Sequence, residues 1–247
     1  ALPERAPRAL PARLANNAAI ATPTPPPRAA HARMYAKPGP NAAWARQAEF
    51  HGVEFVSSYD KPAKMPALAL PEFALVGRSN VGKSSCLNTL AGRRKKVAKV
   101  SKTPGRTRLI NLFRVGKSCA VVDLPGYGFA KVSGELQEEW RLSIEQYLRS
   151  RAELFCVIVL VDLSVPPQAK DAQILDFLEA NDINTLVVAT KVDKVSGAER
   201  VQQALADQRA ALELPDEQPL LFSSTTGEGR SDLWRVLEDM AKESSRR

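Results

Sequence analysis

The chain has 247 residues and a formal net charge of +8, and its 44% hydrophobic content is enough for one sizeable core rather than two domains. Its longest apolar run, Leu154 to Val161, is far shorter than the roughly 20 residues that a membrane-spanning helix needs, so we expect no membrane association. The chain has only two histidines, which argues against a zinc site and histidine-based nucleophilic catalysis. Its three cysteines are isolated in the sequence, which argues against a disulfide framework, and we interpret them as reduced core thiols.

The first segment, residues 1–48, is rich in Ala, Pro and Arg and carries seven basic residues against one acid. Its Thr-Pro-Thr-Pro-Pro-Pro run at residues 22–27 prevents a regular helix or strand, so we expect a disordered basic extension. An Arg-rich, acid-poor composition suits an organelle-targeting segment, which favours a plastid or mitochondrial location. Serine is absent before Ser57, however, so a nonspecific basic tail on a protein of a bacterial-type cytoplasm is the alternative.

Residues 49–247 alternate between apolar runs and helix-length segments, which predicts one α/β domain. Strands are expected at 50–56, 73–76, 109–115, 119–122, 155–161, 185–190 and 220–223. Helices are expected at 85–90, 134–151, 168–180, 197–212 and 231–244. Gly116-Lys117 joins two strands as a hairpin, so we predict a three-layer sandwich with a mostly parallel sheet and one antiparallel edge strand.

The loop after the 73–76 strand matches the phosphate-binding pattern G-x-x-x-x-G-K-[ST] at every position. Its residues are Gly77, Arg78, Ser79, Asn80, Val81, Gly82, Lys83 and Ser84. Strand, loop and helix follow one another as this motif requires, so backbone amides and the helix dipole converge on phosphate oxygens. Lys83 adds a positive charge, and Ser84 supplies a hydroxyl ligand for Mg²⁺.

A D-x-x-G pattern follows the 119–122 strand. It consists of Asp123, Leu124, Pro125 and Gly126. We expect its acid to reach Mg²⁺ through water and its glycine amide to meet the γ-phosphate of a nucleotide. This short pattern is weak evidence alone, but its place at the end of a predicted parallel strand is where ligands of open α/β sheets bind.

Base selection is assigned to the segment that follows the 185–190 strand. Its residues are Thr190, Lys191, Val192 and Asp193. The Asp193 carboxylate can accept two hydrogen bonds from guanine that adenine cannot offer, while the Lys191 stem covers the base. Backbone amides after the last strand complete the guanine site, at Phe222, Ser223 and Ser224. The pattern therefore predicts GTP and GDP as ligands.

Four runs in this sequence resemble the EngB (YihA/YsxC) GTPases of the Era-like (TrmE-Era-EngA-EngB-Septin-like) superfamily, over about residues 50–245. They are residues 77–85, 102–107, 123–131 and 190–193. The resemblance implies a P-loop GTPase of the translation-factor class that acts in assembly of the large ribosomal subunit. It says nothing about residues 1–48, which the compact bacterial members lack.

The same resemblance assigns roles to individual residues. It implies that Mg²⁺ is bound by Ser84 and Thr107, and that residues 123–131 open the second switch. It places the first, nucleotide-sensing switch at Gly105, Arg106, Thr107, Arg108 and Leu109. The catalytic residues that it implies are Lys83, Thr107 and Gly126.

One position predicts slow hydrolysis. Many small GTPases place a glutamine after the D-x-x-G pattern to orient the attacking water, and this chain has Tyr127 there. A K⁺ ion held by Asn80, or a group from a bound partner, could replace the missing amide. The alternatives are that Asn80 only braces the loop and that Tyr127 packs against the core or a partner.

Charge is concentrated in a predicted loop, residues 93–108, which has eight basic residues and no acid. The chain outside this loop and the 1–48 extension sums to −6. If GTP orders the loop, contacts of its Lys and Arg side chains with rRNA phosphates would depend on the nucleotide. The alternative is an ordinary solvated loop. The apolar stripe of the 134–151 helix is expected to face the core rather than a partner, and we expect a monomer.

These observations favour a slowly hydrolysing GTPase that binds the large ribosomal subunit or its precursor. Two other functions stay open: a GTP-regulated septation or membrane-associated protein, and a nucleotide-binding module that scarcely hydrolyses GTP and works by occupancy.

Overall fold

The structure is a computed structural model, and it describes residues 52–92, 97–98, 109–126 and 134–244, with only the backbone of 134–140. The predicted 1–48 extension, the switch residues 105–108, Tyr127 and most of the 93–108 loop therefore lie outside the described residues. Within the described ranges, no helix combines the length and the apolar character that a bilayer span requires.

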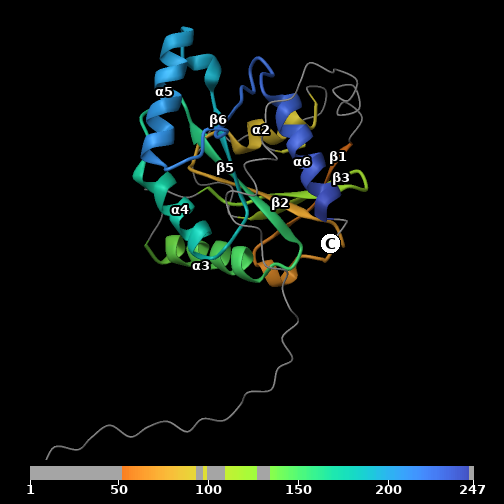
Figure 1. The fold of residues 1–247 in the computed structure, drawn as a ribbon. Coiled ribbons are helices and arrows are strands. Elements are labelled where there is room, and N and C mark those ends of the chain that lie inside the picture. The colour runs from red at the N-terminus through yellow and green to blue at the C-terminus, as the bar shows by residue number, and fades with distance from the viewer. Residues whose placement is uncertain (1–51, 93–96, 99–108, 127–133, 245–247) are drawn as a thin grey trace, which may run out of the picture.

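In the described residues, seven strands form one twisted sheet in the order β1-β3-β4-β2-β5-β6-β7 (Figure 1). Their bounds are β1 Val53–Tyr59, β2 Glu72–Gly77, β3 Ile110–Val115, β4 Cys119–Asp123, β5 Leu154–Asp162, β6 Thr185–Thr190 and β7 Leu220–Leu221. β4, β2, β5, β6 and β7 run parallel, and β3 is antiparallel to both of its neighbours. The predicted fold class is confirmed, but the antiparallel strand lies one place in from the edge because β1 pairs outside it.

Helices cover both faces of the sheet, as a three-layer sandwich requires. Their bounds are α2 Lys83–Leu90, α3 Gly134–Ser150, α4 Ala169–Ala180, α5 Ala198–Ala211 and α6 Arg230–Ser244, with short 3₁₀ turns at η3 Pro62–Lys64 and η4 Val192–Lys194. α2 and α6 pack on one face with Phe73 and Leu75 of β2, while α3, α4 and α5 pack on the other with Ala74 and Val76. Because both faces of β2 are covered, its sequence is a continuous apolar run.

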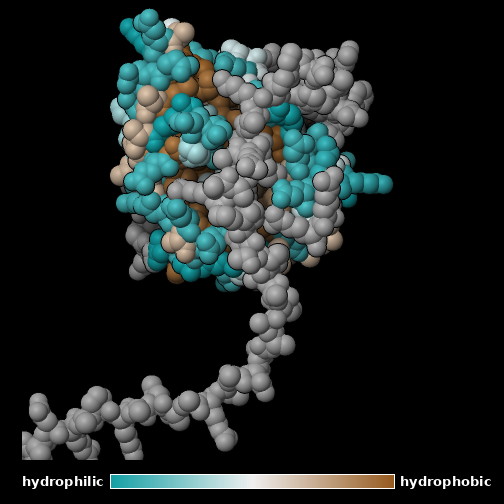
Figure 2. Space-filling view, viewed as in Figure 1, coloured by the Kyte–Doolittle hydropathy of each residue, from teal (hydrophilic) through white to brown (hydrophobic). Residues whose placement is uncertain are grey.

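Hydrophilic side chains dominate the outer sides of α4 and α5 in Figure 2, with hydrophobic residues visible in the recesses behind them. The predicted burial of Cys86, Cys119 and Cys156 is confirmed, and their thiols are free. The α3 stripe also faces the core as predicted, since Tyr147 and Leu148 are buried. The side chains of Leu136 and Trp140, which belong to the same predicted stripe, are outside the described residues.

The predicted bounds of the first strand, which were based on alternating apolar and polar residues, are wrong. The strand was expected at 50–56, whereas β1 extends to Tyr59 and shows three consecutive exposed residues after Val53. The pairing register with β3 shifts between Phe55 and Ser57, which leaves Val56 in a bulge. A bulge interrupts the two-residue period, and an edge strand takes its register from its neighbour rather than from its own pattern.

Candidate nucleotide-binding site

The predicted nucleotide-binding segments meet at one edge of the sheet, because each follows the carboxyl end of a parallel strand. The phosphate loop, residues 77–84, follows β2, and residues 123–126 follow β4. Residues 190–193 follow β6, and residues 222–224 follow β7. Hydrogen bonds and close contacts between these segments, described below, show that the fold brings them together.

The phosphate loop is built around the Lys83 ammonium group. Its Nζ donates hydrogen bonds to the carbonyl oxygens of Gly77, at 2.9 Å, and of Arg78, at 3.4 Å. Burial lowers the pKa of Lys83, and the nearby Asp123 carboxylate partly opposes that effect. Val81 is buried, whereas Asn80 is exposed and has a left-handed backbone conformation with φ of 64°. The loop thus holds one desolvated cation where the motif places the phosphates.

Asp123 lies at the end of β4 and is almost completely buried. Burial raises the pKa of this carboxyl to about 6, although Lys83 and hydrogen bonds with Asn111 and Ser84 act in the opposite direction. Its Oδ1 has no hydrogen-bond partner among the described atoms. A buried carboxylate oxygen without a partner, next to the Ser84 hydroxyl, fits a residue that binds a water ligand of Mg²⁺.

Gly126 lies so close to the phosphate loop that a larger residue would force neighbouring atoms to move. An added Cβ atom would lie 2.7 Å from Lys83 Nζ, 3.2 Å from Ser79 N and 3.3 Å from Gly77 O. Leu124 and Pro125, between it and Asp123, have buried side chains. Only the backbone of this segment is therefore available to a nucleotide, and it faces the loop where the γ-phosphate was predicted.

The base-binding segment is tied to the phosphate loop through Thr190. Its hydroxyl lies 2.7 Å from the carbonyl oxygen of Val81 and 3.0 Å from that of Val161. Lys191 has a left-handed conformation, and its Nζ forms an ion pair with Asp162 at the end of β5. These contacts fix the base-binding segment relative to the phosphate loop.

Asp193 and Ser223 come together from the two predicted guanine-binding segments. Ser223 Oγ donates a 2.5 Å hydrogen bond to Asp193 Oδ1, which is the main reason why the pKa of Asp193 is lowered. Ser223 Oγ also accepts hydrogen bonds from the backbone amides of Thr225 and Thr226. Phe222 is fully buried and Ser224 partly buried. The amides of Phe222 and Ser223 donate to the carbonyl oxygens of Ala189, at 2.8 Å, and Glu228, at 3.0 Å, so of the three predicted guanine donors only the Ser224 amide has no such partner among the described residues. Asp193 is exposed and negatively charged, as a guanine acceptor requires.

Three residues at this edge were not predicted. Asp162 pairs with Lys191, Asn111 hydrogen-bonds to Asp123, and Asp171 pairs with Arg78 of the phosphate loop. Asp162 ends a parallel strand, so the rule that located Asp123 could have found it. Asp171 lies inside α4 and Asn111 on β3, and no local pattern marks either residue.

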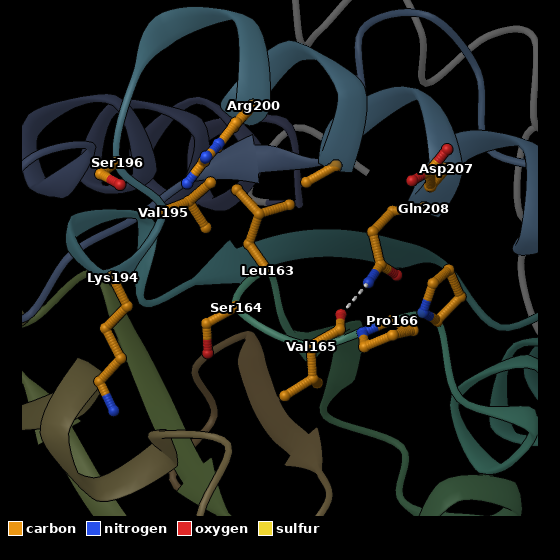
Figure 3. A pocket seen from close by; sticks show the side chains of 12 residues that line it. Leu163, Ser164, Val165, Pro166, Lys194, Val195, Ser196, Arg200, Asp207 and Gln208 are labelled. Atoms are coloured by element: carbon orange, nitrogen blue, oxygen red, sulfur yellow. Dashed lines mark hydrogen bonds between the residues drawn. The ribbon is translucent and has the colours of Figure 1, made fainter.

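A cavity of about 320 Å³ lies next to the base-binding segment (Figure 3). It is formed by the chain after β5, the start of the 194–200 segment and one side of α5. Gln208 points across it, and its Nε2 donates to the Val165 carbonyl at 3.4 Å. None of the predicted nucleotide-binding residues lines this cavity, so it is not the nucleotide site.

Comparison with known proteins identifies the family. The family model described as "50S ribosome-binding GTPase" matches residues 72–191. "Probable GTP-binding protein EngB" of Geobacter metallireducens is 47% identical over 187 residues, which are 76% of this chain and 91% of the relative. The protein of the same name from Pelotomaculum thermopropionicum is 48% identical over 185 residues, 74% of this chain and 92% of the relative. The chain belongs to the EngB family.

Solved structures agree with this assignment. A crystal structure of a probable GTP-binding protein EngB superposes with a TM-score of 0.58 at 27% identity and covers 70% of this chain and 99% of that chain. Era of Aquifex aeolicus, bound to GDP and AlF₄⁻, superposes with a TM-score of 0.55 at 24% identity, covers 68% and 56% of the two chains, and supports the fold alone. As an EngB-family member the chain is a GTP-binding protein and a GTPase, which confirms the predicted ligand and activity.

Proposed function

We propose that this EngB-family GTPase acts in assembly of the large ribosomal subunit. The observation that carries the proposal is the match of residues 72–191 to a family model described as a 50S ribosome-binding GTPase. That stretch includes the 93–108 loop, whose eight basic residues suit contact with rRNA phosphates. Because it also includes the phosphate loop and Asp123, nucleotide binding and subunit binding would be coupled within one segment.

We propose Mg²⁺ as the metal that accompanies GTP, held by the hydroxyl groups of Ser84 and Thr107. Asp123 Oδ1, which has no hydrogen-bond partner in the described part of the chain, and the adjacent Ser84 hydroxyl support this placement. When bound, the metal neutralises charge on the phosphates of GTP. In the protein itself, Lys83 contributes a positive charge to the same phosphates, and the Gly126 backbone lies close enough to the loop to meet the γ-phosphate.

The proposed ribosomal role can be tested by single-turnover GTP hydrolysis with and without purified large ribosomal subunits, in K⁺ and in Na⁺ buffers. Tyr127 occupies the position of the water-orienting glutamine, so we expect slow hydrolysis by the free protein and faster hydrolysis with large subunits. Small subunits serve as the control. An equal rate for the free protein, with large subunits and with small subunits would contradict the ribosomal role. If only K⁺ raises the rate, the group that orients the attacking water would be a cation near Asn80.

A further inference from the structure

An ion pair joins the phosphate loop to helix α4. Arg78 Nε lies 3.0 Å from Oδ2 and 3.2 Å from Oδ1 of Asp171. The Asp171 side chain is 1% exposed and that of Arg78 is 23% exposed. Asp171 lies in the first turn of α4, where the positive end of the helix dipole also stabilises its negative charge. The pair therefore connects two elements that are 93 residues apart in the chain.

The backbone of Arg78 supports two groups of the nucleotide site. Its carbonyl oxygen accepts the Val81 amide at 3.2 Å and the Lys83 ammonium at 3.4 Å. Val81 in turn accepts the Thr190 hydroxyl from the base-binding segment. A residue that fixes Arg78 would therefore restrain the turn of the loop, the position of Lys83 and the contact with Thr190.

We infer that Asp171 is a positioning residue for phosphate binding, which holds the phosphate loop in its binding conformation through the Arg78 guanidinium. Its side chain is buried against Arg78, so it would act through that residue. Its effect is to keep the loop preorganised, so that binding energy from the β-phosphate is not spent on ordering the backbone. The inference rests on nucleotide binding by the EngB family and is independent of the proposed ribosomal role.

The chain provides a matched control in a second buried arginine–carboxylate pair. Arg151 donates to both oxygens of Glu72, at 2.6 and 3.1 Å, and the Glu72 side chain is fully buried. Tyr147 also donates to Glu72, at 2.8 Å. Glu72 begins β2, whereas the phosphate loop follows the other end of that strand. A change at Glu72 should lower stability without altering the loop.

The experiment compares the affinities of GDP and GMP for the full chain and for the Asp171→Asn and Glu72→Gln variants. GMP lacks the β-phosphate, so the ratio of the two dissociation constants isolates the phosphate-dependent part of binding. We expect Asp171→Asn to weaken GDP binding at least about fivefold more than GMP binding. The ratio of the GDP to the GMP dissociation constant should therefore rise by that factor. Glu72→Gln should lower the melting temperature and leave the ratio unchanged.

A second variant keeps the test decisive if Asp171→Asn fails to fold. Arg78→Lys preserves the charge pair but loses the planar guanidinium, so it should fold and still weaken GDP relative to GMP. An unchanged ratio in both folded variants, or an equal change in Glu72→Gln, would overturn the inference and leave the ion pair a purely structural contact.

Discussion

Two carboxylates at the nucleotide site have opposite environments. Asp123 is buried beside Lys83, and burial raises the pKa of its carboxyl to about 6. Asp193 is exposed, and the Ser223 hydroxyl lowers its pKa. The first is therefore suited to a site where a metal ion completes its charge balance, and the second to stable acceptance of hydrogen bonds from guanine.

Guanine specificity can be tested at Asp193. Asp193→Asn replaces an acceptor by an amide donor that faces the guanine donors, which should weaken GTP binding by about 2–3 kcal/mol. Xanthosine nucleotides should be relatively favoured. Calorimetric titrations measure both effects. Ser223→Ala is the control, because it removes only the hydroxyl that supports the Asp193 carboxylate and should therefore weaken GTP binding less. Unchanged GTP affinity in Asp193→Asn would remove this residue from base recognition.

A second residue-scale prediction concerns the pH dependence of stability in the nucleotide-free protein. The pKa of Asp123 rises from its ordinary value of 3.8 to about 6 on folding, so the folded state binds the proton more tightly than the unfolded state. Protonation of Asp123 stabilises the folded state fully below about pH 4, and this stabilisation is lost as the pH rises through 6. The free energy of unfolding should fall by up to about 3 kcal/mol over this range.

Comparison with Asp123→Asn isolates this effect, because other titrating groups contribute equally to both proteins. The free energy of unfolding of the wild type should fall relative to that of the variant between pH 4 and pH 7, as measured by urea denaturation at each pH. A difference between the two proteins that does not vary with pH would contradict the expected titration.

At the scale of elements, most helices and strands could be predicted because each has its own apolar period or run. The β2 to β7 strands and the five helices lie within about two residues of their predicted places, as in α4, expected at 168–180 and found at Ala169–Ala180. β1 could not be placed in this way because its register depends on β3. The nucleotide-binding segments could be predicted because each follows the carboxyl end of a parallel strand. The Asp171–Arg78 contact depends on how α4 packs, and no local sequence pattern predicts it.

The junction between β7 and α6 provides an element-scale prediction. Gly229 has φ of 73°, and an added Cβ atom would lie 1.8 Å from the Leu221 carbonyl oxygen. Gly229→Ala should therefore cost more than about 3 kcal/mol, since backbone atoms must move. It should also weaken GTP binding, because the Ser223 amide donates to the Glu228 carbonyl in the same turn and the Ser223 hydroxyl donates to Asp193.

Gly116→Ala is the matched control for this change. Gly116 also has a positive φ, of 52°, but no described residue has an atom within 4 Å of its added Cβ atom. It should show only the conformational cost of about 1 kcal/mol. Thermal unfolding of both variants separates the two contributions, and equal losses would mean that the β7–α6 turn adjusts without strain.

At the scale of the whole molecule, charge is distributed unevenly along the chain. Residues 93–108 carry eight positive charges and residues 1–48 carry a net +6, while the rest sums to −6. A polyanion would therefore be attracted to two segments and repelled by the remaining surface. The extension would bind RNA whatever the nucleotide, whereas the 93–108 loop contains most of the residues proposed to sense the γ-phosphate, those at 105–108.

The last prediction separates these two contributions. A protein that lacks residues 1–48 should bind large ribosomal subunits more tightly with a nonhydrolysable GTP analogue than with GDP. Its affinity should fall with salt by a log–log slope of about −0.7 to −0.9 for each phosphate neutralised. Replacing Lys95, Lys96 and Lys99 by Ala should reduce that slope without changing nucleotide affinity, because none of them lies in the nucleotide site. The control replaces three exposed lysines elsewhere, Lys117, Lys170 and Lys242, and removes the same net charge. If both triple variants lower the slope equally, or if binding is the same with either nucleotide, the loop is a solvated surface and the coupling does not exist.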